Sequence, residues 1–234
     1  MTPTPRIALL NPNTNAETTR VMARIASDAV EDAFFDARTV PFGPPIITTE
    51  AGLHRAGEQV VSSGKILHRE GFDGILVAGF GDPGLHCLRE IISTPVTGIA
   101  EAAFAEATQH GGKYSVVTTT PDLKASIHDT ASRYGYGENL VSVRITPGAP
   151  EVVMAEPERL AQALHSACLE SIRLDRAEII IIGGGPLALA AETIASELPV
   201  SLINPVIAGA KLACARAGIV RSDGQTAYTP RASR

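Results

Sequence analysis

Short apolar runs recur along this chain and alternate with longer segments that have helical patterns. The clearest runs, rich in β-branched and aliphatic residues, cover residues 6–10, 74–78, 95–99, 114–118, 178–182 and 199–203. Each run has the length of a strand, and this alternation is typical of parallel sheets built from right-handed crossover units. We therefore predict an α/β fold with parallel sheets flanked by helices.

The same features occur once in each half of the chain. Residues 14–29 have a helical pattern with Asn13 or Thr14 as its expected cap, and a comparable helix is expected from Pro121 through Tyr134. We predict two similar half-domains related by an approximate two-fold axis. The first comprises residues 1–110 plus about 205–234, and the second comprises residues 111–204. A cleft between the halves is the natural position for a binding site.

Composition excludes several classes of protein. The net charge of −5 provides no basic surface for nucleic acid. The apolar runs fall far short of the roughly 20 residues that span a bilayer, and the start of the chain has no signal-peptide pattern, so we predict a cytoplasmic protein without membrane contact. Cys87, Cys168 and Cys214 are widely spaced and form no disulfide or metal-ligand pattern. We predict no metal site and a buried helical position for Cys87.

Two of the apolar runs break into glycine-rich loops. The first glycine loop, residues 79–84, reads Gly-Phe-Gly-Asp-Pro-Gly, and the second, residues 183–186, reads Gly-Gly-Gly-Pro. Free backbone N–H groups at such helix starts bind carboxylate, enolate or ureide oxygens. They also stabilise an enolate-like transition state without a charged side chain. The structural alternative is a tight turn in which glycine supplies a positive φ.

The first glycine loop also matches the dinucleotide pattern Gly-x-Gly-x-x-Gly. It lies between a strand and a helix, and Glu101 follows about twenty residues later, where this pattern places an acidic residue for a ribose. Asp82 argues against this interpretation, because it would set a carboxylate beside the pyrophosphate. A nucleotide-binding oxidoreductase is therefore the weakest alternative, and we expect no cofactor.

Four segments resemble the aspartate/glutamate/hydantoin racemase superfamily, most closely its hydantoin and allantoin racemase branch. They are Ile-Ala-Leu-Leu-Asn-Pro-Asn-Thr-Asn at residues 7–15, the first glycine loop, Val-Thr-Thr at residues 117–119 and Asn-Pro-Val at residues 204–206. The resemblance implies a cofactor-independent isomerase fold, a small-molecule substrate and a homo-oligomer. In that branch each glycine loop carries an acid-base cysteine, where this chain has Gly79 and Gly184.

The resemblance and the strand ends together indicate a substrate pocket. The predicted substrate-binding residues are Asn11, Asn13, Phe80, Gly81, Thr118, Thr119, Gly185 and Pro186. Asn13 and Thr120 could equally cap helices.

Glycine has no side chain to titrate, so the standard two-cysteine racemisation is not expected at Gly79 and Gly184. The nearest candidates for moving a proton are His86, Asp82 and Glu101, although Asp82 could instead cap the helix that Pro83 begins. The leading hypothesis is an enzyme that acts at an acidic carbon of a small cyclic ureide or carboxylate, through an enolate-like state held by backbone amides. Isomerase, decarboxylase or lyase, and hydrolase reactions all fit this state. The alternative is a non-catalytic ligand-binding module or a disabled racemase.

Overall fold

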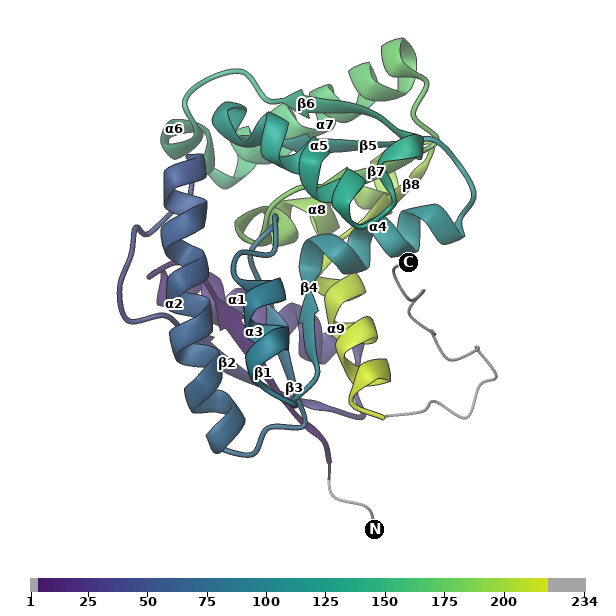
Figure 1. Ribbon diagram of the computed structural model, residues 1–234. Coiled ribbons are helices and arrows are strands. Elements are labelled where there is room, and N and C mark those ends of the chain that lie inside the picture. Colours follow the sequence, from purple (N-terminus) through teal and green to yellow (C-terminus); the bar gives the residue numbers. More distant parts are fainter. Residues whose placement is uncertain (1–3, 219–234) are drawn as a thin grey trace.

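The computed structural model describes residues 4–218 and places their strands in two four-stranded sheets (Figure 1). The first sheet has the order β2-β1-β3-β4 and the second has the order β6-β5-β7-β8, and all pairings are parallel. The strands are β1 (Arg6–Asn11), β2 (Phe34–Thr39), β3 (Gly74–Val77), β4 (Val96–Gly98), β5 (Tyr114–Thr118), β6 (Leu140–Ile145), β7 (Ile179–Ile182) and β8 (Ser201–Ile203). The α/β prediction is confirmed, and the two sheets repeat one strand order.

The six predicted runs all contain strands, whereas β2 and β6 were not predicted. Both lie at the edge of a sheet and carry polar residues, Asp36 and Arg38 in β2 and Ser142 and Arg144 in β6. Central strands of parallel sheets are covered on both faces and form continuous apolar runs, while edge strands do not need to. A search for apolar runs therefore finds the middle of each sheet and misses one edge.

Helices cover both faces of each sheet (Figure 1). They are α1 (Ala16–Ala29), α2 (Glu50–Arg69), α3 (Leu85–Ile91), α4 (Ile99–Gln109), α5 (Lys124–Arg133), α6 (Pro150–Met154), α7 (Pro157–Asp175), α8 (Ala188–Ile194) and α9 (Pro205–Arg216). Helix α4 follows the first sheet and also contacts β7 and β8, and α9 returns from the second sheet to pack on α1, α4, β3 and β4. The exact limits of the two half-domains stay a prediction.

The first helix is capped differently from the prediction. The Asn15 side chain, rather than that of Asn13 or Thr14, accepts the backbone N–H of Thr18 at 3.1 Å and begins α1. The Asn13 side chain instead accepts the N–H of Asn15 and so belongs to the turn before the helix. Thr120 occupies the cap position before the short helix Pro121–Leu123 but makes no capping hydrogen bond.

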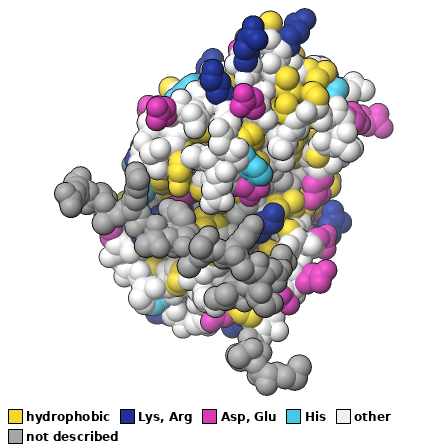
Figure 2. All heavy atoms as spheres, turned by 90° about the vertical axis from the view of Figure 1, so that its right-hand side faces the viewer, with side chains coloured by type: hydrophobic (Ala, Val, Ile, Leu, Met, Phe, Trp, Pro, Cys, Tyr) yellow, Lys and Arg dark blue, Asp and Glu magenta, His cyan; other side chains and the backbone are white. Residues whose placement is uncertain are grey.

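The face in Figure 2 carries charged side chains of both signs. Acidic side chains there are interspersed with basic ones, so this face is not one broad basic surface. Between residues 4 and 218, none of the helices combines the length and the apolar character needed to cross a membrane. Cys168 and Cys214 are buried, but Cys87 is exposed on α3, so its predicted burial is wrong. Its place on the outer side of a short helix explains the difference.

Glycines let α2 lie close against the first glycine loop and α3. A Cβ at Gly84 would lie 2.4 Å from the carbonyl oxygen of Gly57, and a Cβ at Gly64 would lie 2.3 Å from Leu88 Cδ2. Leu88 is fully buried and cannot turn aside into solvent. The position of the loop therefore depends on small residues along one side of α2.

The substitution Gly64→Ala tests this packing. Alanine favours a helix over glycine by about 1 kcal/mol, but the overlap with Leu88 should outweigh this and destabilise the fold by about 1–2 kcal/mol net. Urea unfolding measures the change, with the exposed neighbour Lys65→Ala as control. A stabilised Gly64→Ala variant would show that α2 and α3 are not in tight contact.

Candidate active site

A pocket lies between the carboxyl ends of the two sheets. Segments that follow β1, β2 and β3 form one side, and the end of β5 with segments that follow β5, β6 and β7 forms the other. Its lining comprises Pro12, Asn13, Ile46, Ile47, Leu53, Ala78, Gly79, Phe80, Thr118, Thr119, Thr120, Leu123, Ile127, Met154, Gly183, Gly184, Gly185, Pro186 and Leu187. The cavity volume is about 60 Å³, enough for several water molecules. We call this the central pocket.

The lining carries no titratable side chain within the described part of the chain. It consists of aliphatic groups, one phenyl ring, three threonines, one asparagine and glycine backbone. An anion or an enolate in this pocket would therefore meet neutral donors and not a cationic side chain. Equally, the pocket offers no side chain that could remove a proton.

Backbone N–H groups are the most abundant donors in the lining. In residues 4–218, the N–H groups of Gly79, Phe80, Thr119, Thr120 and Gly185 donate no hydrogen bond. The N–H groups of Gly183 and Gly184 are occupied, since they donate to Val117 and Ile182 respectively. Unbonded N–H groups next to a pocket are the donors from which oxyanion sites are built.

The two predicted asparagines have different positions. Asn11 is fully buried and outside the lining; its side-chain NH₂ donates to Asn13, Asn15 and Thr19, and its Oδ1 accepts the N–H of Asn13. Asn13 lines the pocket, and its Oδ1 accepts from Asn11 and from the N–H of Asn15. This orientation leaves Asn13 Nδ2 without an acceptor among the described residues. Asn11 orients the turn, and Asn13 presents a donor.

The last residue of β5, Thr118, and the two threonines that follow it, Thr119 and Thr120, line the pocket. The Thr118 hydroxyl donates to the carbonyl oxygen of Gly183 at 2.7 Å and so ties the two strand ends together. The Thr119 hydroxyl is 3.5 Å from the sulfur of Met154, a weak partner that a ligand oxygen could replace. Thr118 therefore has a structural bond, while Thr119 keeps a donor for the pocket.

Of the four remaining predicted binding residues, three line the pocket and one does not. Phe80, Gly185 and Pro186 line the pocket, and Phe80 packs edge to face on Phe104 with ring centroids 5.6 Å apart. Gly81 lies outside the lining, where its φ of +104° shapes the turn.

Gly79 and Gly184 both line the pocket, one on each wall, but they differ in the space beside them. A Cβ at Gly79 would lie 2.3 Å from Pro12 Cγ, in a ring that cannot rotate away. Gly184 has an extended backbone with φ 164°, and a Cβ there would lie 3.1 Å from the side chain of Leu187. A side chain is therefore more easily added at Gly184 than at Gly79.

The three candidate proton carriers all lie outside the lining. Asp82 is buried, and its carboxylate accepts the N–H groups of Ala100 and Glu101 at the start of α4. It thus caps α4 and not α3, whose cap position is Gly84. His86 is exposed, stacks near the Tyr134 ring at 5.5 Å, and has a pKa that partial burial, Arg89 and Arg133 lower.

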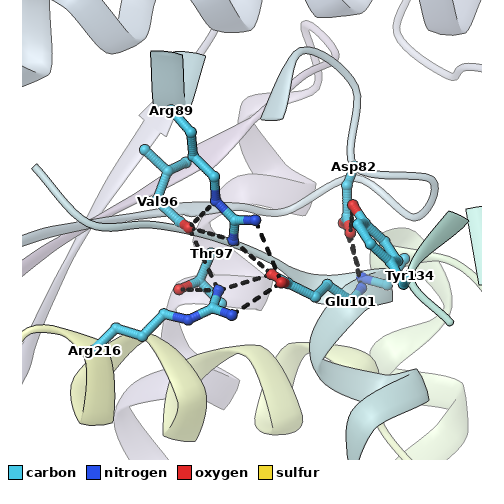
Figure 3. A network of polar contacts seen from close by, with 8 residues as sticks. Asp82, Arg89, Val96, Thr97, Glu101, Tyr134 and Arg216 are labelled. Atoms are coloured by element: carbon cyan, nitrogen blue, oxygen red, sulfur yellow. Dashed lines mark hydrogen bonds and ion pairs between the residues drawn. The ribbon is translucent and has the colours of Figure 1, made fainter. Parts of the chain in front are cut away.

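Glu101 is buried in an ion-pair network (Figure 3). Its oxygens accept from Arg89 at 2.6 Å and from Arg216 at 2.7 and 2.9 Å. Burial alone would raise the pKa of Glu101, but the hydrogen bonds from Arg216 and Arg89 outweigh it and hold the pKa at about 2. Both oxygens are occupied, so Glu101 has no free acceptor for a ribose.

Sequence reasoning missed most of the apolar lining. The missed residues are Pro12, Ile46, Ile47, Leu53, Leu123, Ile127, Met154 and Leu187. Ile46 and Ile47 belong to the proline- and glycine-rich segment 41–49, which follows β2, and this is the one signal that could have indicated a loop over a sheet edge. Pro12 lies in the turn after β1, and the others look like ordinary core residues of helices.

Comparisons with known proteins agree with this architecture. The sequence profile "Asp/Glu/Hydantoin racemase" matches residues 7–213. A hydantoin racemase from Pseudomonas sp. (strain NS671) is 31% identical over 209 residues, which cover 89% of this chain and 84% of that protein. The structure of allantoin racemase from Klebsiella pneumoniae is similar with a TM-score of 0.86 at 28% identity, covering 92% of this chain and 88% of that one. Allantoin racemase from Pseudomonas fluorescens gives 0.85 at 29% identity, with 98% of both chains covered.

The difference between the two glycines predicts an order of stability. Gly79→Cys should destabilise the fold by about 1–3 kcal/mol, because Pro12 must move, whereas Gly184→Cys should change stability by less than about 1 kcal/mol. Thermal unfolding under reducing conditions compares the two variants with the parent protein. A more stable Gly79→Cys than Gly184→Cys would contradict the packing around Pro12.

Removal of the Glu101 charge should be costly. Glu101→Gln leaves Arg89 and Arg216 without their anion and should lower stability by about 3 kcal/mol. Because the pKa of Glu101 is lower in the folded protein than its ordinary 4.5, its contribution is complete above that value and is lost as the pH falls towards 2. Urea unfolding between pH 3 and 7 measures both effects. Glu17→Gln, which breaks an exposed pair with Arg20, is the matched control.

Proposed function

Because this chain belongs to the Asp/Glu/hydantoin racemase family, we propose that it acts at an acidic carbon of a small cyclic ureide or carboxylate in the central pocket. The reaction passes through an enolate-like state whose oxygen accepts hydrogen bonds from backbone N–H groups. The observation that carries the proposal is a pocket walled by both glycine loops, with unbonded backbone N–H groups that include those of Gly79, Phe80, Thr119, Thr120 and Gly185, and with no charged side chain in its described lining.

Neutral donors suit an enolate better than they suit the neutral substrate. Negative charge develops on the carbonyl oxygen as the neighbouring carbon loses its proton, and fixed N–H dipoles in an apolar site stabilise that charge strongly. Asn13 Nδ2 and the Thr119 hydroxyl extend the same set of donors to a second oxygen or to a ring carbonyl. Aliphatic walls from Ile46, Leu123 and Met154 keep bulk water away from these hydrogen bonds.

The proton transfer is assigned to water and not to a thiol pair. Gly79 and Gly184 face the pocket from opposite walls, and neither they nor their lining neighbours can titrate. A water molecule in the central pocket would accept the proton and return one to the enolate carbon. The proposal therefore replaces two-cysteine racemisation with a slower exchange. A carboxylate on the same carbon would leave as CO₂ and give the enolate directly, and a leaving group on the neighbouring carbon would be expelled by the enolate in an elimination.

A ligand-binding module without catalysis is the second candidate. The same observation favours it, since a pocket with donors but no base can bind an oxygen-rich ligand and leave it unchanged. The nucleotide-binding alternative finds less support, because Glu101 is fully engaged with Arg89 and Arg216. Assembly into a homo-oligomer and a cytoplasmic location stay predictions.

Deuterium exchange distinguishes these candidates. The purified protein is incubated in deuterated water with 5-substituted hydantoins, allantoin, aspartate, glutamate and aryl malonates, and NMR follows exchange, products and line broadening of bound ligand. We expect deuterium at the acidic carbon of at least one compound at about a hundredfold or more above the rate in buffer, the effect of one oxyanion donor. Binding without exchange or product would establish the binding module, and absence of binding to every compound would refute both.

The Asn13 amide offers a sharper test of the same site. Asn13→Asp keeps the oxygen that accepts from Asn11 and Asn15 but replaces the free donor with an acceptor. Affinity for whichever compound binds should fall about tenfold, the effect of one hydrogen bond worth about 1.4 kcal/mol. Asn139→Asp, outside the lining, makes the same change of charge and should leave the affinity unaltered. Equal losses in both variants would show that Asn13 does not contact the ligand.

A further inference from the structure

The first glycine loop is held in an unusual backbone conformation at Asp82. Its N–H donates to the carbonyl oxygen of Gly79 at 2.9 Å and closes the turn that carries Gly79 and Phe80 into the pocket. Gly81, Asp82 and Gly84 all have positive φ, of +104°, +49° and +73°. Asp82 is one of two residues other than glycine with positive φ between residues 4 and 218. A side chain in this conformation persists only where its surroundings fix it.

The carboxylate of Asp82 supplies that fixation by capping a helix from another segment. It accepts the N–H of Ala100 at 2.9 Å and that of Glu101 at 2.8 Å, the first free donors of α4. Gly98 precedes α4 and has no side chain to make these bonds. A Cβ at Gly98 would lie 2.1 Å from Asp82 Cγ, so the missing side chain provides the space in which the carboxylate lies.

The Asp82 carboxylate accepts a third hydrogen bond, from a residue beside the second sheet. The hydroxyl of Tyr134, which follows α5 beside the second sheet, donates to Asp82 Oδ2 at 2.9 Å (Figure 3). The Tyr134 ring packs against the apolar cores under both sheets. One carboxylate thus connects the first glycine loop, the start of α4 and a residue beside the second sheet.

We propose that Asp82 is a positioning residue: by binding α4 and Tyr134 at once, it fixes the pocket wall formed by Gly79 and Phe80 relative to the opposite wall at Gly184. It does not touch a ligand, since it lies outside the lining. The inference rests on the proposed function in taking the Gly79 and Phe80 segment as a binding wall. Its test needs no ligand, so it stands or fails separately from the identity of the substrate.

The three hydrogen bonds that Asp82 accepts from Ala100, Glu101 and Tyr134 should respond to pH. Burial raises the pKa of Asp82 from its ordinary 3.8 to about 7, although Ala100, Glu101 and Tyr134 oppose this through their hydrogen bonds. The other titratable or charged groups around it are Glu101 with Arg89 and Arg216, and His86 beside Tyr134 with Arg133. The protonated acid is a weaker acceptor than the carboxylate, so the three bonds should loosen as the pH falls below about 7.

A thiol placed on the opposite wall reports the position of the Gly79 and Phe80 wall. Gly184→Cys is introduced in a Cys87→Ser background, because Cys87 is the exposed cysteine while Cys168 and Cys214 are buried. The rate of alkylation by iodoacetamide, divided by the thiolate fraction, is measured from pH 5.5 to 8.5. We expect a step in this corrected rate near pH 7, and Asp82→Asn should remove the step and change the rate at pH 8 about fivefold or more.

Asparagine is chosen because it tolerates a positive φ, so Asp82→Asn changes the charge of the side chain and not the backbone conformation. Tyr134→Phe should shift the rate in the same direction by a smaller factor, and it keeps the test decisive if Asp82→Asn fails to fold. Hydrogen exchange of the Ala100 and Glu101 amides, followed by mass spectrometry, should accelerate in the Asp82 variant. Asp175→Asn at the end of α7, which breaks the ion pair with Arg144 of β6, is the control for general loss of stability and should leave the thiol rate unchanged.

Two results would overturn the proposal. The first is faster amide exchange at α4 with an unchanged thiol rate, which would make Asp82 a cap without influence on the pocket. The second is a pH step that survives in Asp82→Asn, which would assign the titration to another group.

Discussion

The close approach of two backbone segments, one after each sheet, is the constraint on which the pocket depends. A Cβ at Gly185 would lie 2.8 Å from the carbonyl oxygen of Ala78 and 2.5 Å from the sulfur of Met22. A Cβ at Gly183 would lie 3.3 Å from the Phe80 ring. Only glycine lets the end of β7 come this near to the end of β3. With these contacts in place the two walls face each other across the central pocket, and Thr118 secures the second wall by its bond to Gly183.

The close contact between the two backbone segments determines which hydrogen-bonding groups the pocket offers to a ligand. Where two segments approach through glycine, they expose backbone N–H groups and few side chains. The described lining therefore offers backbone donors and no charged side chain. Those donors are fixed by the strands and helices behind them and need no reorganisation when charge develops on a bound oxygen. The same arrangement that excludes a two-thiol mechanism is therefore the one that favours an enolate-like state. Proton transfer is the step that this chain's side chains do not supply.

The sequence allowed the α/β fold and the two glycine loops to be predicted, for identifiable physical reasons. Central strands such as β3 and β7 are covered on both faces and appear as apolar runs, and the glycine loops that follow them bring Gly79 and Gly184 to the pocket lining. Edge strands β2 and β6 alternate polar and apolar residues and carry no such signal. The partners of Glu101 were unpredictable because Arg216 lies 115 residues away in the sequence. Asn11 and Asn13 share a motif, and only the bonds of the folded turn show which of them faces the pocket.

Two buried carboxylates near the start of α4 show how neighbouring acids acquire opposite properties. Glu101 meets two guanidinium groups, so its pKa falls to about 2 and its charge stabilises the fold at neutral pH. Asp82 meets only neutral donors, which do not offset its burial, and its pKa rises to about 7. The pH dependence of stability has the opposite direction for Asp82. Its contribution to stability is complete below its ordinary pKa of 3.8 and declines as the pH rises towards 7. A carboxylate that reduces stability at neutral pH, in a strained backbone beside the pocket, fits a role in positioning better than a role in folding, because asparagine or glycine at this place would relieve the cost of burial.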